Sequence, residues 1–250
     1  MITPLVDVRD LTIGWGEVVL QKNASFQVER GDIFVILGGS GCGKSTLLRY
    51  LIGLESPTHG EIIVDGKGPV RLGVGRPPFG VTFQSGALLG SMTVEDNVGL
   101  PLQEWTDLPP EAISAVVQAK LRLVGLQGTE TKAPSELSGG MKKRAAIARA
   151  MALEPELIFL DEPSGGLDPV TAAELDELLI TLNQKLGLTL VVVTHDLESI
   201  FKIAKHCIML DRKSQSIIAR GDPRELRKQS KDPRVRNFFN RIPASEVADE

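Results

Sequence analysis

The first part of the chain carries two hydrophobic patterns that predict strands in different surroundings. Apolar and polar residues alternate over residues 5–13 and 24–28, which is typical of half-buried antiparallel strands. The run from Ile33 to Leu37 is apolar throughout, which is typical of a strand covered on both faces. A glycine-rich loop follows that run, and then a predicted helix over residues 45–54 that ends near Gly53. We therefore expect an antiparallel pair, a buried strand, a loop and a helix, in that order.

The middle of the chain is predicted to be mainly helical. Short strands at residues 61–64 and 81–83 come first. Helical patterns then cover residues 94–102, 110–124 and 138–152, with Pro101, Pro109, Pro110 and Pro134 separating them. We interpret about residues 86–152 as a helical subdomain inserted in a main domain. That domain is expected to span residues 1–222, with a basic extension at residues 223–250.

Strand and helix patterns alternate again in the last third of the chain. Strands are predicted at residues 157–160, 188–193, 207–210 and 217–219, and helices at residues 169–185 and 196–204. Alternation of this kind is typical of α/β proteins in which most strands run parallel. The sequence therefore predicts an α/β fold with a mostly parallel core sheet.

Composition and charge exclude several classes of protein. The 250 residues include 28 Lys and Arg against 32 Asp and Glu, a net charge of −4, so we expect no nucleic-acid partner. The two cysteines, Cys42 and Cys207, lie far apart and favour a reducing compartment over a disulfide framework. No secretory signal is expected, and the longest apolar runs are far shorter than the roughly 18 residues of a spanning helix. Any membrane component is therefore expected to come from another chain.

A loop with the spacing of a phosphate-binding site follows the buried strand. Its residues are Gly38, Gly39, Ser40, Gly41, Cys42, Gly43, Lys44 and Ser45, with Thr46 next. Glycines allow backbone N–H groups to approach phosphates, and the following helix directs its positive dipole end to the same place. We predict that Lys44 reaches the β- and γ-phosphates, that Ser45 offers its hydroxyl to Mg²⁺, and that Thr46 donates near the α-phosphate. Cys42 is expected to be a small, tolerated residue whose thiol pKa the local positive potential could lower.

Polar residues also follow two later strands. Asp161 and Glu162 come directly after the strand at residues 157–160, and His195 follows the strand at residues 188–193. In open parallel sheets, ligands bind beyond the carboxyl ends of the strands, where the strand before Lys44 also ends. We predict that Asp161 holds Mg²⁺ through water, that Glu162 polarises an attacking water, and that His195 contacts the γ-phosphate.

A second anion site is predicted where an alanine-rich helix begins, at Leu137, Ser138, Gly139, Gly140 and Met141. Ser138 is a suitable N-cap, and the two glycines leave the first backbone N–H groups open to an anion. One phosphate group cannot easily serve both this helix start and the loop of Lys44 within one chain. This suggests a head-to-tail pair of chains, each completing the site of the other.

Together and in this order, these motifs resemble the nucleotide-binding subunit of an ABC (ATP-binding cassette) transporter over residues 5–222. The resemblance implies a phosphate-loop NTPase cassette with an additional antiparallel β subdomain, which hydrolyses ATP with Mg²⁺. It implies that Gln84 contacts Mg²⁺ and senses the membrane partner, and that Asp168 lies at the dimer interface. Ser138, Gly139 and Gly140 would contact the γ-phosphate of the opposite subunit, and Trp15 matches an aromatic residue that stacks on adenine.

A narrower resemblance links the chain to the ATPases of Mla/Mce-type lipid transport systems. The residues that carry it are Phe83 to Leu88, Met92 to Val94, Asn97, Val98, Asp232 to Arg236, and Met141 where most transporter ATPases have Gln. It implies a homodimer at the cytoplasmic face of the inner membrane, an integral membrane permease, an Mce-type lipid-binding protein and phospholipid cargo. A Gly/Pro-rich link at residues 66–78 departs from the family, which has a longer segment there. Two alternatives stay open: an importer ATPase for small polar solutes, and a soluble ABC-type ATPase acting on nucleic acid or ribosomes.

Two further segments could contact partners. The apolar residues of segment 85–105 could form a groove for a helix of the membrane partner, or could belong to the subdomain core. Residues 222–241 hold seven Lys or Arg and three Asp or Glu, and could contact an anionic membrane or a partner, or form a solvated tail. Phe238 and Phe239 within that segment favour packing on the body of the protein or on a second subunit.

Overall fold

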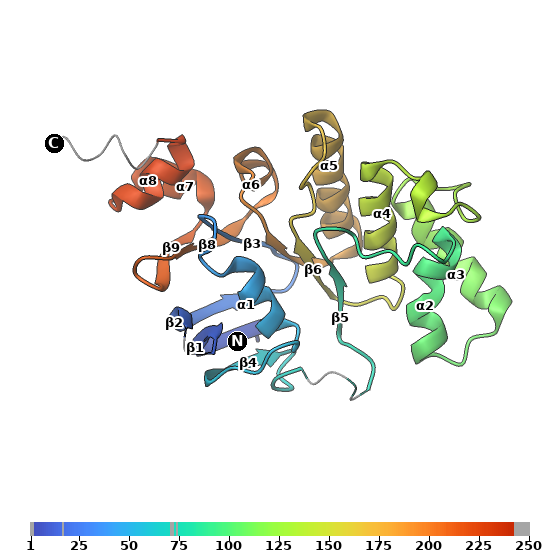
Figure 1. Cartoon of the computed structure of the whole chain (residues 1–250), viewed down its shortest axis with the longest axis horizontal. Coiled ribbons are helices and arrows are strands. Elements are labelled where there is room, and N and C mark those ends of the chain that lie inside the picture. Colours follow the sequence, from blue (N-terminus) through green and yellow to red (C-terminus); the bar gives the residue numbers. More distant parts are fainter. Residues whose placement is uncertain (1–2, 17, 71–72, 74, 243–250) are drawn as a thin grey trace. The chain divides into compact units, whose positions relative to one another are not determined.

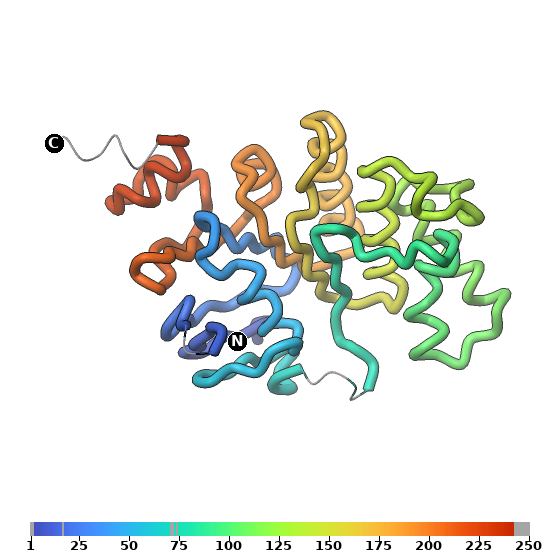
Figure 2. Tube along the Cα trace, in the orientation of Figure 1, coloured from blue at the N-terminus to red at the C-terminus, as the bar shows by residue number. Residues whose placement is uncertain are grey.

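A computed structural model describes residues 3–16, 18–70, 73 and 75–242. The chain forms two compact units: unit 1 contains residues 1–74 and 191–250, and unit 2 contains residues 75–190. The first and last parts of the described chain therefore belong to unit 1, drawn blue to cyan and orange to red in Figure 2. Within the described residues, no helix combines the length and the apolar character needed to cross a membrane.

Unit 1 contains an antiparallel sheet and a second set of strands, with a parallel and an antiparallel pair. β1 (Val6–Trp15) pairs antiparallel with β2 (Val18–Val28) and with β4 (His59–Val64). β3 (Ile33–Gly38), buried along its whole length as its apolar run predicts, pairs parallel with β8 (His206–Asp211). β8 pairs in turn with β9 (Ser216–Gly221) in the antiparallel sense. The antiparallel pair predicted from residues 5–13 and 24–28 is confirmed.

Four helices complete the described part of unit 1. They are α1 (Lys44–Leu51), α6 (Leu197–Ile203), α7 (Pro223–Gln229) and α8 (Pro233–Asn240). α1 ends close to the predicted position, where Gly53 adopts a positive φ of 76° that suits a glycine. Of the predicted link at residues 66–78, positions 71–72 and 74 lie outside the described residues.

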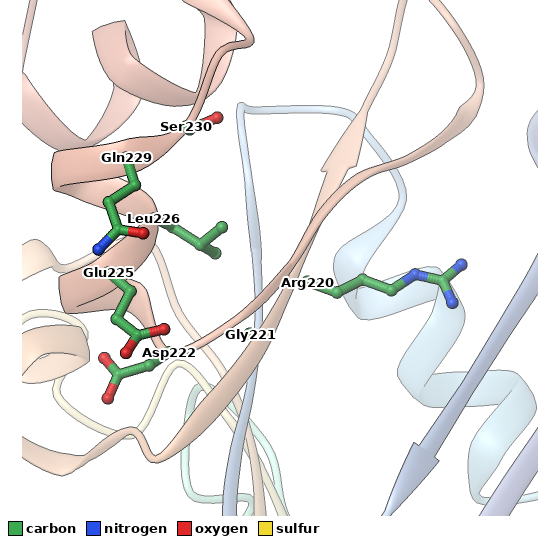
Figure 3. A pocket seen from close by; sticks show the side chains of 7 residues that line it. All are labelled: Arg220, Gly221, Asp222, Glu225, Leu226, Gln229 and Ser230. Atoms are coloured by element: carbon green, nitrogen blue, oxygen red, sulfur yellow. The ribbon is translucent and has the colours of Figure 1, made fainter.

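The two C-terminal helices are packed on unit 1 rather than solvated. Phe239 of α8 is almost fully buried, with its ring 5.6 Å from that of Phe201 in α6. Arg234 Nη1 donates to Asp211 Oδ2 over 2.9 Å and so ties α8 to the end of β8. A small hollow lies at the β9–α7 turn, where Asp222 and Glu225 point away from Arg220 (Figure 3). The expectation that Phe238 and Phe239 favour packing on the body is confirmed for Phe239, and the alternative of a solvated tail is wrong.

Unit 2 contains a parallel strand pair and a helical group. β5 (Phe79–Thr82) pairs parallel with β6 (Leu157–Asp161). β7 (Thr189–Val193) starts in unit 2, where Thr189 N–H donates to the Glu156 carbonyl over 2.8 Å, and its residues 191–193 belong to unit 1. The helices are α2 (Val94–Trp105), α3 (Pro110–Leu123), the 3₁₀ turn Pro134–Glu136, α4 (Gly139–Ala150) and α5 (Pro169–Leu186). In Figure 1, α2, α3 and α4 lie together at one end of unit 2. The three predicted helical patterns of this region are confirmed.

The predicted end of the first of these helices is wrong. α2 continues through Pro101 to Trp105 although proline cannot donate the hydrogen bond to the carbonyl four residues back. Two features hold the helix together across this position. Its start carries a Thr93–Asp96 capping box, and its inner face is buried at Val98 and Leu102. Tertiary packing therefore outweighs the local cost of the proline.

Candidate active site

The phosphate loop between β3 and α1 requires glycine at specific positions. Gly38, Gly41 and Gly43 adopt φ angles of 147°, 71° and 101°, which side chains rarely allow. A Cβ at Gly38 would lie 2.4 Å from the carbonyl oxygen of Leu210 and 2.7 Å from Cys42 Sγ. The glycine pattern is thus explained by the turn of the backbone and by close packing beneath it.

Lys44 holds the loop from within. Its Nζ donates to the carbonyl oxygens of Gly38 and Gly39 over 3.0 and 3.1 Å. An ammonium group has three N–H donors, so these two acceptors leave one for a ligand. The loop is also held from below, because Gln21 Nε2 donates to the carbonyls of Cys42 (2.9 Å) and Asp211 (3.1 Å). The sequence analysis missed Gln21, since it precedes the alternating segment at residues 24–28.

Cys42 is a buried thiol of low reactivity rather than an activated one. Burial raises its pKa, and the positive charge of Lys44 opposes that effect only in part. The expectation that local positive potential could lower this pKa is therefore wrong, because desolvation of the thiolate dominates. The side chain fills the space beside Gly38.

Trp15 lies beside the start of α1. Its indole Nε1 donates to Thr46 Oγ1 over 3.4 Å, and the Arg49 guanidinium lies over the ring, 5.4 Å from its centre. The Tyr50 hydroxyl donates to the Gly14 carbonyl over 2.9 Å and so ties the turn of Trp15 to the same helix. The structure thus places the predicted adenine-stacking residue next to the predicted phosphate loop.

His195 is exposed at the end of β7. The N–H of the preceding residue, Thr194, donates to the carbonyl of Ile36 in β3 over 3.3 Å. His195 therefore follows β7 at the edge where β3 leads into the phosphate loop. This confirms the expectation that His195 and the loop of Lys44 share one edge of the sheet.

Gln84 and Glu162 occupy matching positions in unit 2. Thr82 of β5 pairs with Leu160 of β6, so each residue lies two positions beyond a paired strand end. Glu162 is buried and adopts a φ of 47°, a conformation that costs free energy for a residue other than glycine. Such strain persists only where surrounding contacts enforce it. Asp161, the residue before it, is half-buried at the end of β6.

Two basic residues of α4 reach the segment around Gln84, and the sequence analysis missed both. Lys143 Nζ donates to the carbonyl oxygens of Gln84 and Glu162, the latter over 3.0 Å. Arg149 donates to the carbonyls of Gly86 (2.9 Å) and Ala87 (2.8 Å). One signal was available: Lys143 shares a helix face with the buried Ile147 and Ala150, where a charged residue needs an explanation.

The predicted second anion site is a capped helix start. Ser138 Oγ accepts from Met141 N–H over 3.3 Å, which confirms the predicted N-cap of α4. Asp168 caps α5 in the same way and accepts from the N–H and hydroxyl of Thr171 over 3.0 and 2.6 Å; these bonds lower its pKa. A Cβ at Gly140 would lie 2.5 Å from Thr171 Cγ2. Gly140 therefore allows the two helix starts, with Ser138 and Asp168, to pack closely together.

Comparison with known proteins assigns the family. A model of the ABC transporter family matches residues 21–165. The Escherichia coli K12 "Intermembrane phospholipid transport system ATP-binding protein MlaF" is 46% identical over 247 residues, covering 96% of this chain and 90% of that protein. The chain belongs to the ABC transporter ATP-binding family. It is therefore a nucleotide-binding ATPase, and the predicted α/β fold of the ABC cassette type is confirmed.

Other relatives show how the family varies. The Mycobacterium leprae "Probable ribonucleotide transport ATP-binding protein mkl" is 40% identical over 94% of this ABC chain and 68% of its own. The dimeric ABC cassette MJ0796 bound to ADP and Pi is 30% identical, with a TM-score of 0.76 over 87% of this chain and 98% of that one. Clostridium perfringens CbiO1, part of the transporter complex CbiONQ, is 28% identical, with a TM-score of 0.81 over 96% of this chain and 97% of that one.

Proposed function

We propose that this ABC ATPase drives phospholipid transport between bacterial membranes. The observation that carries the proposal is the 46% identity to MlaF over 96% of the chain. The sequence features in which the chain resembles lipid-transport ATPases support it. They include Met141, directly after Gly139 and Gly140, and the Asp232–Arg236 segment at the start of α8. The competing cargo is a small polar solute, because the mkl protein at 40% identity bears the name of a ribonucleotide transporter.

The phosphate-loop residues are proposed to bind ATP. The backbone N–H groups of residues 38–46 and the remaining donor of Lys44 would hold the phosphates, and the hydroxyl of Thr46 would donate near the α-phosphate. The adenine would stack on Trp15, whose ring is already oriented by Thr46 and Arg49. His195, at the same strand edge, would donate to the γ-phosphate.

The proposed metal ligands fit Mg²⁺ by their chemistry. Ser45, Gln84 and Asp161 offer a hydroxyl, an amide oxygen and a carboxylate, all of them hard oxygen donors that Mg²⁺ prefers. One carboxylate with substrate phosphates is a common ligand set for this ion. When bound, Mg²⁺ would neutralise negative charge on the β- and γ-phosphates.

Glu162 is proposed to be the general base that orients and polarises the attacking water. Its burial and its enforced backbone conformation fix the carboxylate in one place, as water activation requires. We predict that Glu162→Gln retains ATP binding but lowers turnover by about a hundredfold or more, because the amide cannot accept the proton. Phosphate release and nucleotide titration measure the two effects. Full turnover by this variant would contradict the assignment.

The chain is proposed to act as a homodimer bound to an integral membrane permease at the cytoplasmic face of the inner membrane. The dimeric state of the related cassette MJ0796 supports pairing. In the proposed dimer, Ser138, Gly139 and Gly140 of one subunit would face the γ-phosphate held by the other, and Asp168 would lie at the interface. Apolar side chains after Gln84 support permease docking: Leu89 is 44% exposed and Trp105 is 40% exposed, while Leu102 is buried and belongs to the core. An Mce-type lipid-binding protein would complete the system.

Purification of the tagged, full-length chain with its native membrane partner tests the proposed cargo. The complex is reconstituted in vesicles that carry fluorescent phospholipid, and ATP-dependent lipid movement is compared with that of the Glu162→Gln complex. We expect lipid movement only with the wild-type chain. Stimulation of ATPase by a polar solute, without lipid movement, would favour the importer instead. Co-purification of nucleic acid or ribosomes without a membrane protein would contradict the transport class.

A further inference from the structure

Lys143 is a buried cation whose ammonium group contacts two proposed catalytic segments. The residue is only 9% exposed, and its Nζ donates to the carbonyls of Gln84 and Glu162. Burial of an ammonium costs several kcal/mol unless hydrogen bonds and nearby charge compensate it. Here burial lowers the pKa of Lys143, and the carboxylates of Glu162 and Asp161 oppose that shift. An apolar residue would fill this position of α4 at lower cost, so the charge needs a reason beyond packing.

The carbonyl of Glu162 is the more informative of the two contacts. Glu162 is held at a φ of 47°, and its carbonyl accepts from both Lys143 Nζ and the N–H of Gly165, each over 3.0 Å. These two donors fix the peptide plane beyond Glu162 and thereby enforce a conformation that the residue would not adopt alone. That conformation sets the direction of the Glu162 Cα–Cβ bond. Lys143 is thus one of the groups that determine in which direction the Glu162 side chain leaves the main chain.

The carbonyl of Gln84 connects the same ammonium group to the second segment. Gln84 follows β5, and a Cβ at Gly165 would lie 3.8 Å from Gln84 Nε2, so the Gln84 amide lies close to the turn after Glu162. Arg149 holds the next part of the segment through Gly86 and Ala87 but makes no such contact with Glu162. Lys143 therefore differs from Arg149 in joining both segments to α4, the helix that begins at Ser138.

We propose that Lys143 is a positioning residue for hydrolysis, which fixes the main chain of Gln84 and Glu162 relative to each other and to α4. This inference rests on the roles proposed above for Gln84 and Glu162. Its consequence is that the geometry of water activation depends on α4, the helix whose start is proposed to contact nucleotide in the opposite subunit. Lys143 itself touches neither nucleotide nor water in this proposal; it acts through the two carbonyls.

Steady-state ATPase kinetics of the purified, full-length chain with Mg²⁺-ATP test the proposal. Lys143→Met keeps the length of the side chain but removes every donor, and we expect kcat to fall by roughly tenfold or more while KM for ATP changes by less than about threefold. Lys143→Arg retains donors for both carbonyls and is expected to recover much of kcat. If the role of Lys143 were purely structural, Lys143→Met would lower the free energy of unfolding without lowering kcat at a nearly constant KM.

Two matched variants on the same helix serve as controls. The Lys142 ammonium group makes no hydrogen bond or ion pair within the described part of the chain, and Lys142→Met is expected to retain wild-type kcat. Arg149→Met removes a cation from the same loop but not from Glu162, and it is expected to lower kcat less than Lys143→Met does. Should Lys143→Met fail to fold, Lys143→Gln is measured in its place. Its side chain is one atom shorter and its planar amide is not expected to reach both carbonyls, so kcat should again fall while KM changes little.

Three outcomes would overturn the proposal. Wild-type kcat in Lys143→Met (or in Lys143→Gln) shows that the contacts are not needed. An equal loss of kcat in Arg149→Met shows that the segment after Gln84 as a whole is responsible, and not the hydrogen bond from Lys143 to the Glu162 carbonyl. No recovery in Lys143→Arg shows that the two hydrogen bonds are not the cause. Because the assay needs neither permease nor lipid, failure of the proposed phospholipid transport would leave its result unaffected, and Glu162→Gln reports separately on the assigned base.

Discussion

At the scale of single residues, Gly140 shows that a motif glycine can be required by packing as well as by ligand access. A methyl group at this position would lie 2.5 Å from Thr171 Cγ2, closer than carbon atoms approach. We predict that Gly140→Ala lowers the free energy of unfolding by about 1–3 kcal/mol, measured by urea denaturation. Thr171→Ser removes the opposing methyl group but keeps the hydroxyl that bonds Asp168, so the double variant is expected to recover most of the loss. If the free-energy losses of the two single variants simply added in the double variant, steric overlap between residues 140 and 171 would be contradicted.

Cys207 provides a residue-scale test of pH dependence. Burial raises the pKa of its thiol to about 12 from 9.0. A group whose pKa is raised on folding stabilises the protein fully below its unfolded pKa, and this contribution is lost as pH rises toward the folded value. Between pH 9 and pH 10, the wild-type free energy of unfolding should therefore fall by about 1 kcal/mol more than that of Cys207→Ala. Parallel pH profiles for the two proteins would show that the thiolate is tolerated in the fold.

At the scale of elements, α8 shows how a strongly charged segment can depend on one buried ring. An isolated helix of eight residues is unstable in water, so α8 relies on Phe239 against Phe201 and on the Arg234–Asp211 bond. We predict that Phe239→Ala, at a cost of about 3 kcal/mol, speeds amide hydrogen exchange in α8 by about a hundredfold. Arg236→Ala, at an exposed position of the same helix, serves as the control and should leave exchange unchanged. Equal protection in both variants would show that the ring does not anchor the helix.

Hydrophobic periodicity predicted almost every strand and helix before α7, because buried faces impose their spacing on the sequence. It missed α7 and α8, whose charged residues dominate their patterns. Each begins with an Asp-Pro pair, at Asp222 and Asp232, which is the same N-cap signal that Asp168 and Pro169 carry at the start of α5. The wrong boundary at Pro101 has the opposite cause, since a correct local signal was overridden by packing of α2.

The candidate site divides in the same way between what spacing reveals and what only contacts reveal. Lys44, Ser138, Glu162 and His195 were predictable, because they follow strands or begin helices at fixed offsets in the chain. The contacts of Gln21 and Lys143 were not, because these depend on which carbonyl groups the two side chains meet after folding; the charge of Lys143 on a buried helix face indicated only that it needed an explanation. Residues expected to bind ligand leave a pattern in the sequence. Residues that hold the backbone of those binding residues in place can be identified only from the three-dimensional structure.

At the scale of the whole molecule, the proposed dimer implies that each ATPase site is formed by two chains, which a mixture of two inactive variants can test. If the phosphate loop of one subunit works with the Ser138 helix start of the other, Lys44→Ala and Ser138→Arg should each inactivate a homodimer. A mixed dimer of the two variants nevertheless contains one complete site, with Lys44 from one chain and Ser138 from the other. We therefore expect ATPase activity to reappear when the two inactive proteins are mixed, measured by phosphate release. Mixing each variant with more of itself is the control, and a mixture as inactive as its components would contradict a site shared between subunits.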